Sequence, residues 1–452
     1  MKTLCVALCL SALLLPAGMS RAQTQAGNEM FPGIGAVLGE PKPAVATGPA
    51  LTLDEIQQIA LAENPEIHVA VRRVTMAEAH VPTTGTLEDP QLMVREWQVP
   101  LSKPWDYNAA QNMLMVGRSL TGPGKRGLQT SIARSDVEAM KDDLEATRLR
   151  VRVEVRKAFY DLLLTQEELR IHDQHVEIAR QAIEAARIKY TVGKVPQQDI
   201  LKAQLAMMRL AEHMIHFERD ADVARAQMNT LLGRDPSTPL NLQGDFGVDA
   251  VLPSDKALEQ LAQQARPDLL AAQVAVEKSA QEEALTKKAF VPDFSVAAGY
   301  MRMPTGSDFR DNYMLEGSMS LPWLNRRKHN AEIAESAAKV NEQDAEVAAA
   351  RTAAFGQIEE ALAEARAAQR LARVYSDTLR PQAEETLHAA VIAYENNQTD
   401  LLDLLDSQMT VIDIDLSSFQ AMGDFAARWS ELELAVGAPL ESVQPGAPEA
   451  KP

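Results

Sequence analysis

The sequence YTVGKVPQQDILKAQ at residues 190–204 returns as YENNQTDLLDLLDSQ at residues 394–408, and the match continues without a gap to Gly233 and Gly437. Earlier landmarks recur at a similar offset, since Asn-Pro-Glu-Ile in the first half corresponds to Arg-Pro-Asp-Leu in the second. A period of about 200 residues is far longer than the repeat of a solenoid. The sequence therefore predicts a tandem duplication, with two similar domain-sized halves packed side by side.

The first 22 residues have the pattern of a secretory signal peptide. Lys2 supplies the positive charge, residues 4–15 an apolar stretch, and residues 20–22 a small-x-small cleavage site. The apolar stretch is shorter than the roughly 20 residues that a membrane-spanning helix needs. Both cysteines, Cys5 and Cys9, lie in this leader. We therefore expect a mature chain beyond the inner membrane, without disulfides, thiolate metal sites or a cysteine nucleophile.

The two ends of the chain and its net charge further restrict the class of protein. Residues 23–50 and 441–452 are rich in Pro and Gly and are expected to be disordered. The formal net charge of −18 disfavours nucleic acid as a partner. No later run of 18 apolar residues is present, so membrane insertion would require strands closed into a barrel.

Each half contains a stretch that favours a very long helix. Residues 128–192 contain neither Gly nor Pro, which predicts a helix of roughly 98 Å at 1.5 Å per residue. Residues 149–155 alternate like a strand, but their flanks carry no turn residues, so helix is expected there too. The counterpart runs from Arg326 to about Tyr394, interrupted by Gly356 and Pro381, and Pro381 is expected to kink it or to mark its last third.

A short polar turn and a returning helix are expected after each long helix. This predicts two antiparallel helical hairpins, at about residues 124–233 and 326–437. The halves themselves are expected to span residues 51–245 and 251–440.

A β-hairpin is expected ahead of each helical hairpin, at about residues 89–120 and 291–322. Strands of roughly ten residues are long enough to cross a bilayer at a tilt. Aromatic residues fall near the strand ends, where interfacial aromatics belong: Trp97, Trp105, Tyr107, Tyr300, Tyr313 and Trp323. Soluble hairpins have the same appearance, so this pattern leaves both alternatives open. Closed barrels of this kind begin at about eight strands, so transmembrane strands would need several chains, and three copies would supply twelve.

Four motifs carry a resemblance to a known family. They are Leu51-Thr-Leu-Asp-Glu-Ile with Ala62-Glu-Asn-Pro-Glu-Ile67, Leu120-Thr-Gly-Pro-Gly-Lys-Arg126, Pro381-Gln-Ala-Glu384, and Tyr394 through Asp406. Together they resemble the TolC family of outer-membrane efflux ducts, and the second and third resemble its heavy-metal branch of CzcC- and CusC-like channels. The resemblance covers about residues 51 to 440. The lipid-attachment cysteine of some metal-branch relatives is absent here, so anchoring would rest on the barrel alone.

The resemblance implies a mainly α fold with a small β part. Four β-strands per chain would complete a trimeric 12-stranded β-barrel in the outer membrane, continued by a long periplasmic α-helical barrel. The expected function is a passive homotrimeric duct that works with a periplasmic adaptor and an inner-membrane RND-type pump. Heavy-metal cations are the expected cargo, and drugs or other organic compounds are the alternative. No cofactor and no enzymatic activity are expected.

The resemblance places a periplasmic gate at the turns between the long and returning helices. The turn residues are Tyr190, Gly193, Tyr394 and Asn397. Asp199, Asp403 and Asp406 follow these turns, and three chains would bring nine such carboxylates to one opening as a cation-attracting ring. The alternative is that they are ordinary helix N-terminal acids, stabilised by the helix dipole.

Two His-x-x-His pairs flank the first turn, one on each antiparallel helix. His172 and His175 precede the turn, and His213 and His216 follow it at the same distance. Four imidazoles at one level could bind a transition metal. The alternative is four exposed histidines on a polar helix face.

Eighteen methionines raise the possibility of Cu(I), which prefers thioether ligands. Met113, Met115, Met314 and Met319 alternate along the expected strands, which favours lipid-facing or packing roles instead. No phosphate-binding Gly loop, His-Glu-x-x-His sequence or nucleophile elbow is present. Two other classes remain as alternatives to the duct: a periplasmic adaptor and a periplasmic coiled-coil structural protein.

Overall fold

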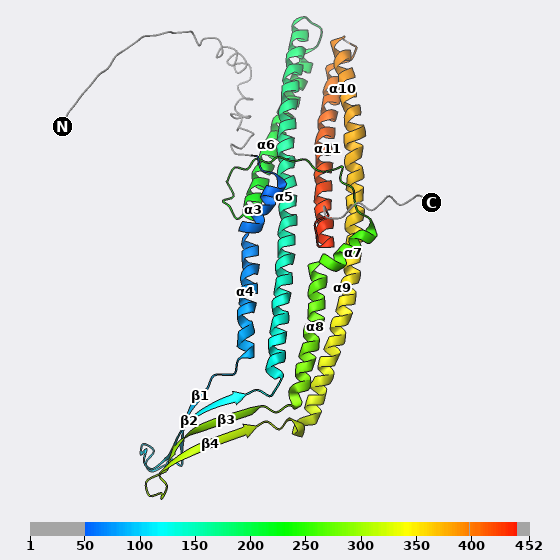
Figure 1. The fold of residues 1–452 in the computed structure, drawn as a ribbon. Helices are drawn as coiled ribbons and strands as arrows, with labels where there is room; N and C mark the ends of the chain where they lie inside the picture. Colours follow the sequence, from blue (N-terminus) through cyan, green and yellow to red (C-terminus); the bar gives the residue numbers. More distant parts are fainter. Residues whose placement is uncertain (1–49, 397, 441–452) are drawn as a thin grey trace, which may run out of the picture.

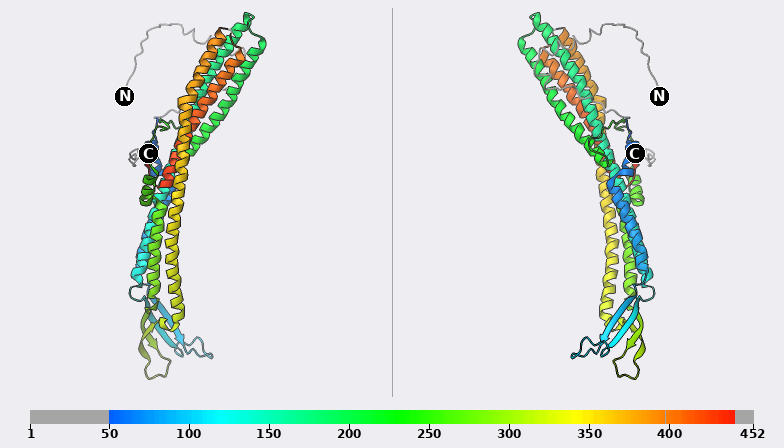
Figure 2. Two further views of the ribbon diagram at one scale, coloured as in Figure 1. Left: turned by 90° about the vertical axis from the view of Figure 1, so that its right-hand side faces the viewer. Right: turned by 90° about the vertical axis from the view of Figure 1, so that its left-hand side faces the viewer.

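The computed structural model describes residues 50–396 and 398–440. The expected signal peptide, both expected flanking segments and Asn397 lie outside these residues. The described chain is strongly elongated, with two helical hairpins at one end and a β-sheet at the other (Figure 1). Figure 2 shows that the helices run together along most of its length.

The two halves have the same order of elements. The first contains α3 (Leu53–Glu63), α4 (Pro65–Gly85), β1 (Gln91–Trp97), β2 (Gln111–Leu120), α5 (Lys125–Thr191) and α6 (Gln197–Leu231). The second contains α7 (Asp255–Ala265), α8 (Pro267–Lys287), β3 (Phe294–Arg302), β4 (Asp311–Met319), α9 (Arg326–Val374), α10 (Arg380–Glu395) and α11 (Leu401–Val436). Three short turns complete the second half: the 3₁₀ turns η1 (Lys288–Phe290) and η2 (Pro322–Asn325), and the π turn η3 (Tyr375–Leu379). The predicted fold class, mainly helical with four strands and an internal repeat, is confirmed.

Side-chain caps fix the start of the first two helices. Thr52 and Glu55 form a reciprocal capping box at the start of α3. The Asn64 side chain accepts a hydrogen bond from the amide of Glu66 at 2.9 Å and donates one to the carbonyl of Leu231 at 2.9 Å. The Asn-Pro pair of the sequence motif therefore starts α4 and also ties it to the end of α6.

Helix α5 is 67 residues long, which corresponds to about 100 Å. The segment that alternates like a strand is helical, as expected, and Val151, Val153 and Val155 are all buried. At about 100° per residue, Val151 and Val155 lie on one side of the helix and Val153 lies on the opposite side. Their burial follows because α4, α6, α8 and α11 all pack against α5.

The second long helix differs from the expectation at Gly356, whereas Pro381 marks the start of its last segment, as one of the two expectations had it. Gly356 does not interrupt α9, and a Cβ added at this glycine would touch nothing within 4 Å. Pro381 lies in the first turn of α10, directly after the π turn η3. A proline lacks the amide hydrogen of a regular helix and its ring crowds the preceding turn. The wider π turn accommodates that residue without ending the helix.

The four strands form one antiparallel sheet in the order β1-β2-β3-β4. One face carries exposed apolar side chains from every strand: Leu92, Val94, Leu114, Val116, Phe294, Val296, Tyr300, Tyr313, Leu315 and Met319. Side chains on the other face are mostly half-buried or buried. Met113, Met115 and Met314 lie on this second face, where the burial of Met115 agrees with the packing role, whereas Met319 lies on the exposed face. Successive side chains of a strand point to opposite faces of the sheet, and the sequence alone did not show which alternate set of residues was exposed.

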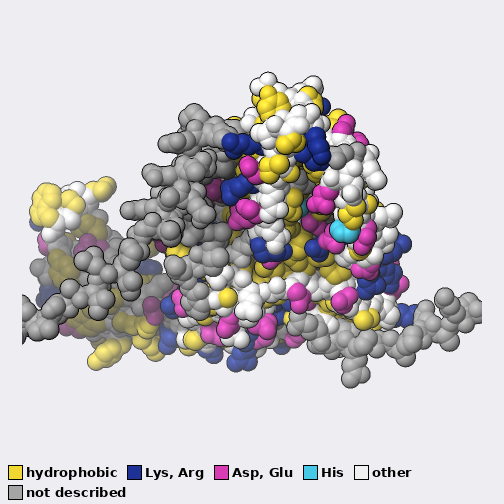
Figure 3. All heavy atoms as spheres, turned by 90° about the horizontal axis from the view of Figure 1, so that it is seen from above, with side chains coloured by type: hydrophobic (Ala, Val, Ile, Leu, Met, Phe, Trp, Pro, Cys, Tyr) yellow, Lys and Arg dark blue, Asp and Glu magenta, His cyan; other side chains and the backbone are white. Residues whose placement is uncertain are grey.

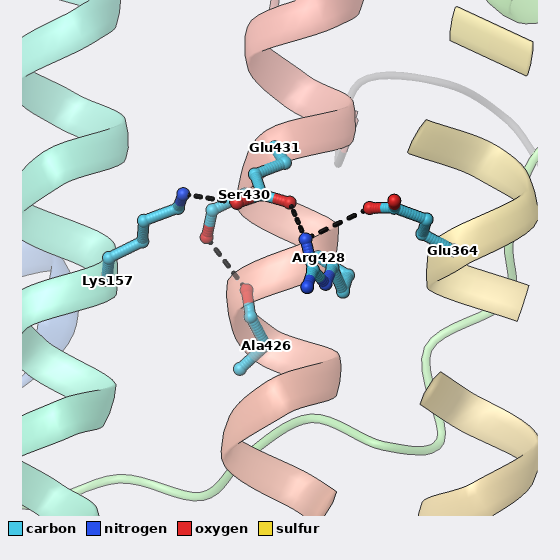
Figure 4. Close-up of polar contacts among 6 residues, drawn as sticks. All are labelled: Lys157, Glu364, Ala426, Arg428, Ser430 and Glu431. Atoms are coloured by element: carbon cyan, nitrogen blue, oxygen red, sulfur yellow. Dashed lines mark hydrogen bonds and ion pairs between the residues drawn. The ribbon is translucent and has the colours of Figure 1, made fainter. Parts of the chain in front are cut away.

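Polar contacts join the helices where the two halves meet. Figure 4 shows Arg428 and Glu431 of α11 between Lys157 of α5 and Glu364 of α9. Lys157 Nζ lies 2.6 Å from Glu431, and Arg428 Nη1 lies 2.7 Å from Glu431 and 3.0 Å from Glu364. Burial opposes ionisation of Glu431, but hydrogen bonds from Lys157 and Arg428 outweigh it and lower its pKa.

A buried ion pair lies close to this network. Arg156 Nη1 of α5 is 2.8 Å from Glu433 Oε2 of α11, and the two side chains are only 7% and 2% exposed. Glu433 also accepts hydrogen bonds from the Trp429 indole at 3.3 Å and the Leu440 amide at 3.1 Å. The carboxylate is therefore well satisfied, and it fixes α5 of the first half against α11 of the second. No helix among the described residues combines the length and apolarity needed to cross a membrane.

Candidate functional site: the tips of the helical hairpins

The first hairpin turn is built around a glycine in the left-handed region. Helix α5 ends at Thr191, and Gly193 follows with φ of 73°. The amide of Gly193 donates to the carbonyl of Tyr190, and that of Lys194 to the carbonyl of Lys189, both at 2.9 Å. This arrangement satisfies the last carbonyls of α5, and glycine adopts the required φ without a steric cost.

The second turn is closed by aspartate and threonine side chains. Asp400 caps α11 and accepts a hydrogen bond from the amide of Asp403 at 3.0 Å. The hydroxyl of Thr399 donates to the carboxylate of Asp403. Asp403 therefore takes part in the start of α11, as the alternative interpretation of a helix N-terminal acid expects.

A lysine and a tyrosine join the two hairpins at the tip. Lys189 Nζ donates a hydrogen bond to the carbonyl of Tyr394 and lies 3.6 Å from the centroid of its ring. Tyr394 is only 4% exposed, whereas its counterpart in the repeat, Tyr190, is 43% exposed. The same position of the repeat is therefore covered in one hairpin and uncovered in the other.

Tyr394 belongs to a small apolar core between the hairpins. The other buried members of this core are Ala186, Ala203, Leu401, Leu404 and Leu405. The Tyr394 hydroxyl is buried, with no hydrogen-bond partner among the described residues. Burial raises the pKa of Tyr394, and the charge of the nearby, half-buried Asp199 raises it further.

The three tip carboxylates do not converge within one chain. Asp403 and Asp406 are exposed on α11, while Asp199 is half-buried near Tyr394. Among residues 50–396 and 398–440, no group of three or more His, Cys, Asp or Glu side chains is placed to hold a metal ion. Viewed from the tip end, acidic and basic side chains are interspersed over the surface (Figure 3).

The histidines do not form the metal site that the sequence pattern suggested. His172 and His175 are only 3% and 4% exposed, so the alternative of four exposed histidines is also wrong. His172 Nε2 lies 2.5 Å from the carbonyl of Leu210, and His175 Nε2 lies 3.7 Å from Asp415 of α11. His213 is half-buried and His216 is exposed. Equal sequence distances from the turn place the four histidines at the same height along the hairpin. They do not determine the side to which each side chain points, which depends on the neighbouring helices.

The partner of His175 is a charged residue that the sequence analysis missed. Asp415 is 8% exposed on the buried side of α11, and its Oδ1 lies 2.9 Å from Arg380 Nε at the start of α10. An aspartate among the apolar positions of α11 was the available signal. Asp415 therefore links both hairpins about five turns above the tip.

Lowering the pH is expected to weaken the packing around His172. Burial lowers its pKa below the usual 6.5, because the charged imidazole would lose solvation. Between these two values the unfolded chain binds the extra proton and the folded chain does not, so stability falls as the pH falls below about 6.5. His172→Gln is expected to lose this part of the pH dependence in thermal melts followed by circular dichroism. His216→Gln is the control, and an unchanged slope in His172→Gln would contradict the expectation.

The fold and the tip define a class of elongated, duplicated helical-hairpin proteins with a four-stranded sheet. The family model for outer membrane efflux proteins matches residues 56–234 and 258–438, once in each half. The chain belongs to the outer membrane efflux protein family. It is therefore an efflux channel of the outer membrane that extends into the periplasm, and the adaptor and structural-protein alternatives are wrong.

Similar proteins support the metal branch and the fold. The cobalt-zinc-cadmium resistance protein CzcC of Cupriavidus metallidurans is 23% identical over 422 residues, covering 91% of this chain and 94% of CzcC. The crystal structure of CusC matches with a TM-score of 0.71 at 16% identity, over 85% of this chain and 92% of that one. The open-state structure of the Neisseria gonorrhoeae channel MtrE matches with a TM-score of 0.70 at 18% identity, over 86% and 89%.

Proposed function

We propose that the protein is a passive homotrimeric duct for heavy-metal cations, working with a periplasmic adaptor and an inner-membrane RND-type pump. The single observation that carries the duct is the combination of a helix of about 100 Å with a sheet at its far end. Such a helix has the length to bridge a compartment. A duct needs no catalytic group of its own, because its partners supply the energy.

The exposed face of the sheet supports assembly from several chains. Its apolar side chains extend over all four strands. A soluble monomer rarely exposes a continuous apolar surface of this size to water. The strands β1 and β4 each have one unpaired edge. In lipid every backbone group needs a partner, so these edges require neighbouring chains. Three copies would close twelve strands into a barrel in outer-membrane lipid.

Metal cations are the proposed cargo because of the relative and the motifs. CzcC is named for resistance to cobalt, zinc and cadmium, and the sequence motifs at residues 120–126 and 381–384 resemble the same branch. Deletion of the gene is expected to raise the metal content of cells several-fold in medium with added metal. Equal metal content, with a rise in retained organic compounds instead, would select the drug-export alternative.

We further propose that the hairpin tips form the gate. Lys189 and Tyr394 hold the two hairpins of one chain together, and Asp403 and Asp406 remain exposed for a ring formed with other chains. Carboxylates in such a ring repel one another and attract cations. The gate would open when the contact between the hairpins is released.

The double variant Asp403→Ala/Asp406→Ala is expected to change the pore. Removal of six carboxylates from a trimer should lower the preference for cations and weaken block by multivalent cations about tenfold in planar bilayers. The matched control is Asp413→Ala/Asp424→Ala, which removes two exposed carboxylates from the same helix away from the tip. Unaltered selectivity and block in the tip variant would show that these residues only start the helix.

A further inference from the structure

Methionines from all four strands gather on the face of the sheet opposite the exposed apolar one. Met93 of β1 is paired with Met115 of β2. Met115 is paired with Gly299 of β3, which in turn is paired with Met314 of β4. One row across the sheet therefore contains three methionines and a glycine.

The neighbouring row adds two more methionines. Met113 of β2 is paired with Met301 of β3, between Arg95 and Asn312 at the two ends of the row. We call the five residues the methionine patch: Met93, Met113, Met115, Met301 and Met314. Strand spacing and rise give the patch a size of about 14 by 7 Å. Cross-strand and diagonal neighbours at this spacing are within reach of long side chains such as methionine.

Two glycines make room for the side chains of the patch. The Cγ of Met115 lies 2.7 Å from the place where a Cβ on Gly299 would stand. The Cε of Met93 lies 3.0 Å from the corresponding place on Gly117. Met115 is 1% exposed, and the other four are half-buried. The side chains of Met115 and Met93 therefore lie over Gly299 and Gly117. In its row, Met115 stands next to Met93 and is separated from Met314 by Gly299 of β3.

The donor set of the patch is soft and neutral. Thioethers select Cu(I) and similar soft ions, whereas zinc and cobalt favour imidazole or thiolate. The Met301 sulfur accepts a hydrogen bond from the side-chain amide of Gln111, so this thioether already acts as an electron-pair donor in the fold. Glu316 lies on the same face two residues beyond Met314, and Arg95 lies at the opposite side of the patch. The positive charge of Arg95 and the negative charge of Glu316 therefore lie on opposite sides of the patch.

We propose that the methionine patch is a binding site for a soft monovalent cation, Cu(I) or Ag(I), on the face of the sheet that lines the export path. The proposal deepens the proposed function and rests on it for the orientation of this face. Neutral thioethers bind such ions without a full opposing charge, and a conducting site must release its ion as well as accept it. The cargo class would then be soft monovalent ions, in contrast to the metals for which CzcC is named.

The full-length protein in detergent is titrated with Ag(I), which serves as a stable substitute for Cu(I). Met113→Leu/Met115→Leu/Met301→Leu keeps the volume and removes three sulfurs, and its affinity for Ag(I) is expected to fall at least tenfold. The control is Met76→Leu/Met208→Leu/Met319→Leu, which removes three exposed methionines outside the patch. Unchanged affinity in the patch variant, or an equal loss in the control, overturns the proposal.

A second measurement uses the unmodified protein, so it does not depend on the folding of a variant. Oxidation of methionines by hydrogen peroxide is followed by mass spectrometry with and without metal. Ag(I) is expected to slow oxidation of Met113 and Met301 at least fivefold, with no effect on Met76. Zn(II) is expected to protect none of them. Absence of protection by Ag(I), or equal protection by Zn(II), overturns the soft-cation site.

The metal content of cells lacking the gene separates the two proposals. Protection by Ag(I) together with unchanged silver and copper content in the deletion strain supports the site but contradicts export of these metals. Raised metal content in the deletion strain without protection by Ag(I) supports the duct and overturns the site.

Discussion

Glu433→Leu is expected to destabilise the helical region by about 3–5 kcal/mol, the largest effect of any single change considered. The substitution leaves Arg156 buried without its carboxylate, and an uncompensated buried charge has this cost. It also leaves the indole of Trp429 and the amide of Leu440 without their acceptor. Melting followed by circular dichroism at 222 nm measures the loss, and hydrogen exchange should locate it in α5 and α11.

The double variant Arg156→Met/Glu433→Leu tests the cause. Replacing both charges by apolar side chains of similar volume removes the stranded charge, and such replacements are often neutral or stabilising. We expect most of the stability to return in the double variant. Equal destabilisation in the single and double variants would instead assign the loss to packing of the Glu433 side chain.

Gly299→Ala is expected to prevent correct assembly of the sheet. Its new Cβ would stand 2.3 Å from the Leu114 carbonyl oxygen and 2.7 Å from the Met115 Cα, both backbone atoms of the paired strand. Neither atom can move without displacing β2, so the cost should reach or exceed the upper end of overpacking, about 3 kcal/mol. The amount of heat-modifiable protein in the outer membrane is expected to fall at least fivefold.

Gly317→Ala is the matched control for this change. Gly317 lies in β4 of the same sheet, and a Cβ there would meet nothing within 4 Å. Its assembly is expected to stay within about a third of the unchanged protein. A similar loss in both variants would show that alanine is disfavoured at strand glycines generally, and not by the close approach of β2.

The fold was largely accessible from the sequence because its signals are long. A stretch of 65 residues without Gly or Pro has few structural alternatives, and the repeated tyrosine-to-glycine segment revealed the duplication. Local exceptions had different causes. Gly356 stays within α9 because a single glycine costs a long helix only about 1 kcal/mol relative to alanine. The buried valines at residues 151–155 require neighbours on opposite sides of α5.

The site was less accessible than the fold. Gly193 lies in the first turn as predicted, but Tyr190 and Tyr394 belong to the ends of α5 and α10 and not to the turns. Sequence also cannot show that Tyr394 is covered and Tyr190 exposed, because that difference arises between the two hairpins. The direction of the histidines likewise depends on where α11 lies. The face of Met113 and Met115 needed the strand register, since a shift of one residue would exchange the faces.

The π turn at residues 375–379 gives the two hairpins different helical geometry. One extra residue in a helical turn rotates everything beyond it by about 100° relative to a regular helix. The first hairpin has no such phase change, since α5 is continuous over 67 residues. In a ring of three chains, hairpins with a continuous long helix would alternate with hairpins that contain the π turn. The symmetry of such a ring is three-fold and not six-fold. Any twisting of the tip would be expected to start at the π turn of the second hairpin, while α5 stays in place as the axis of that movement.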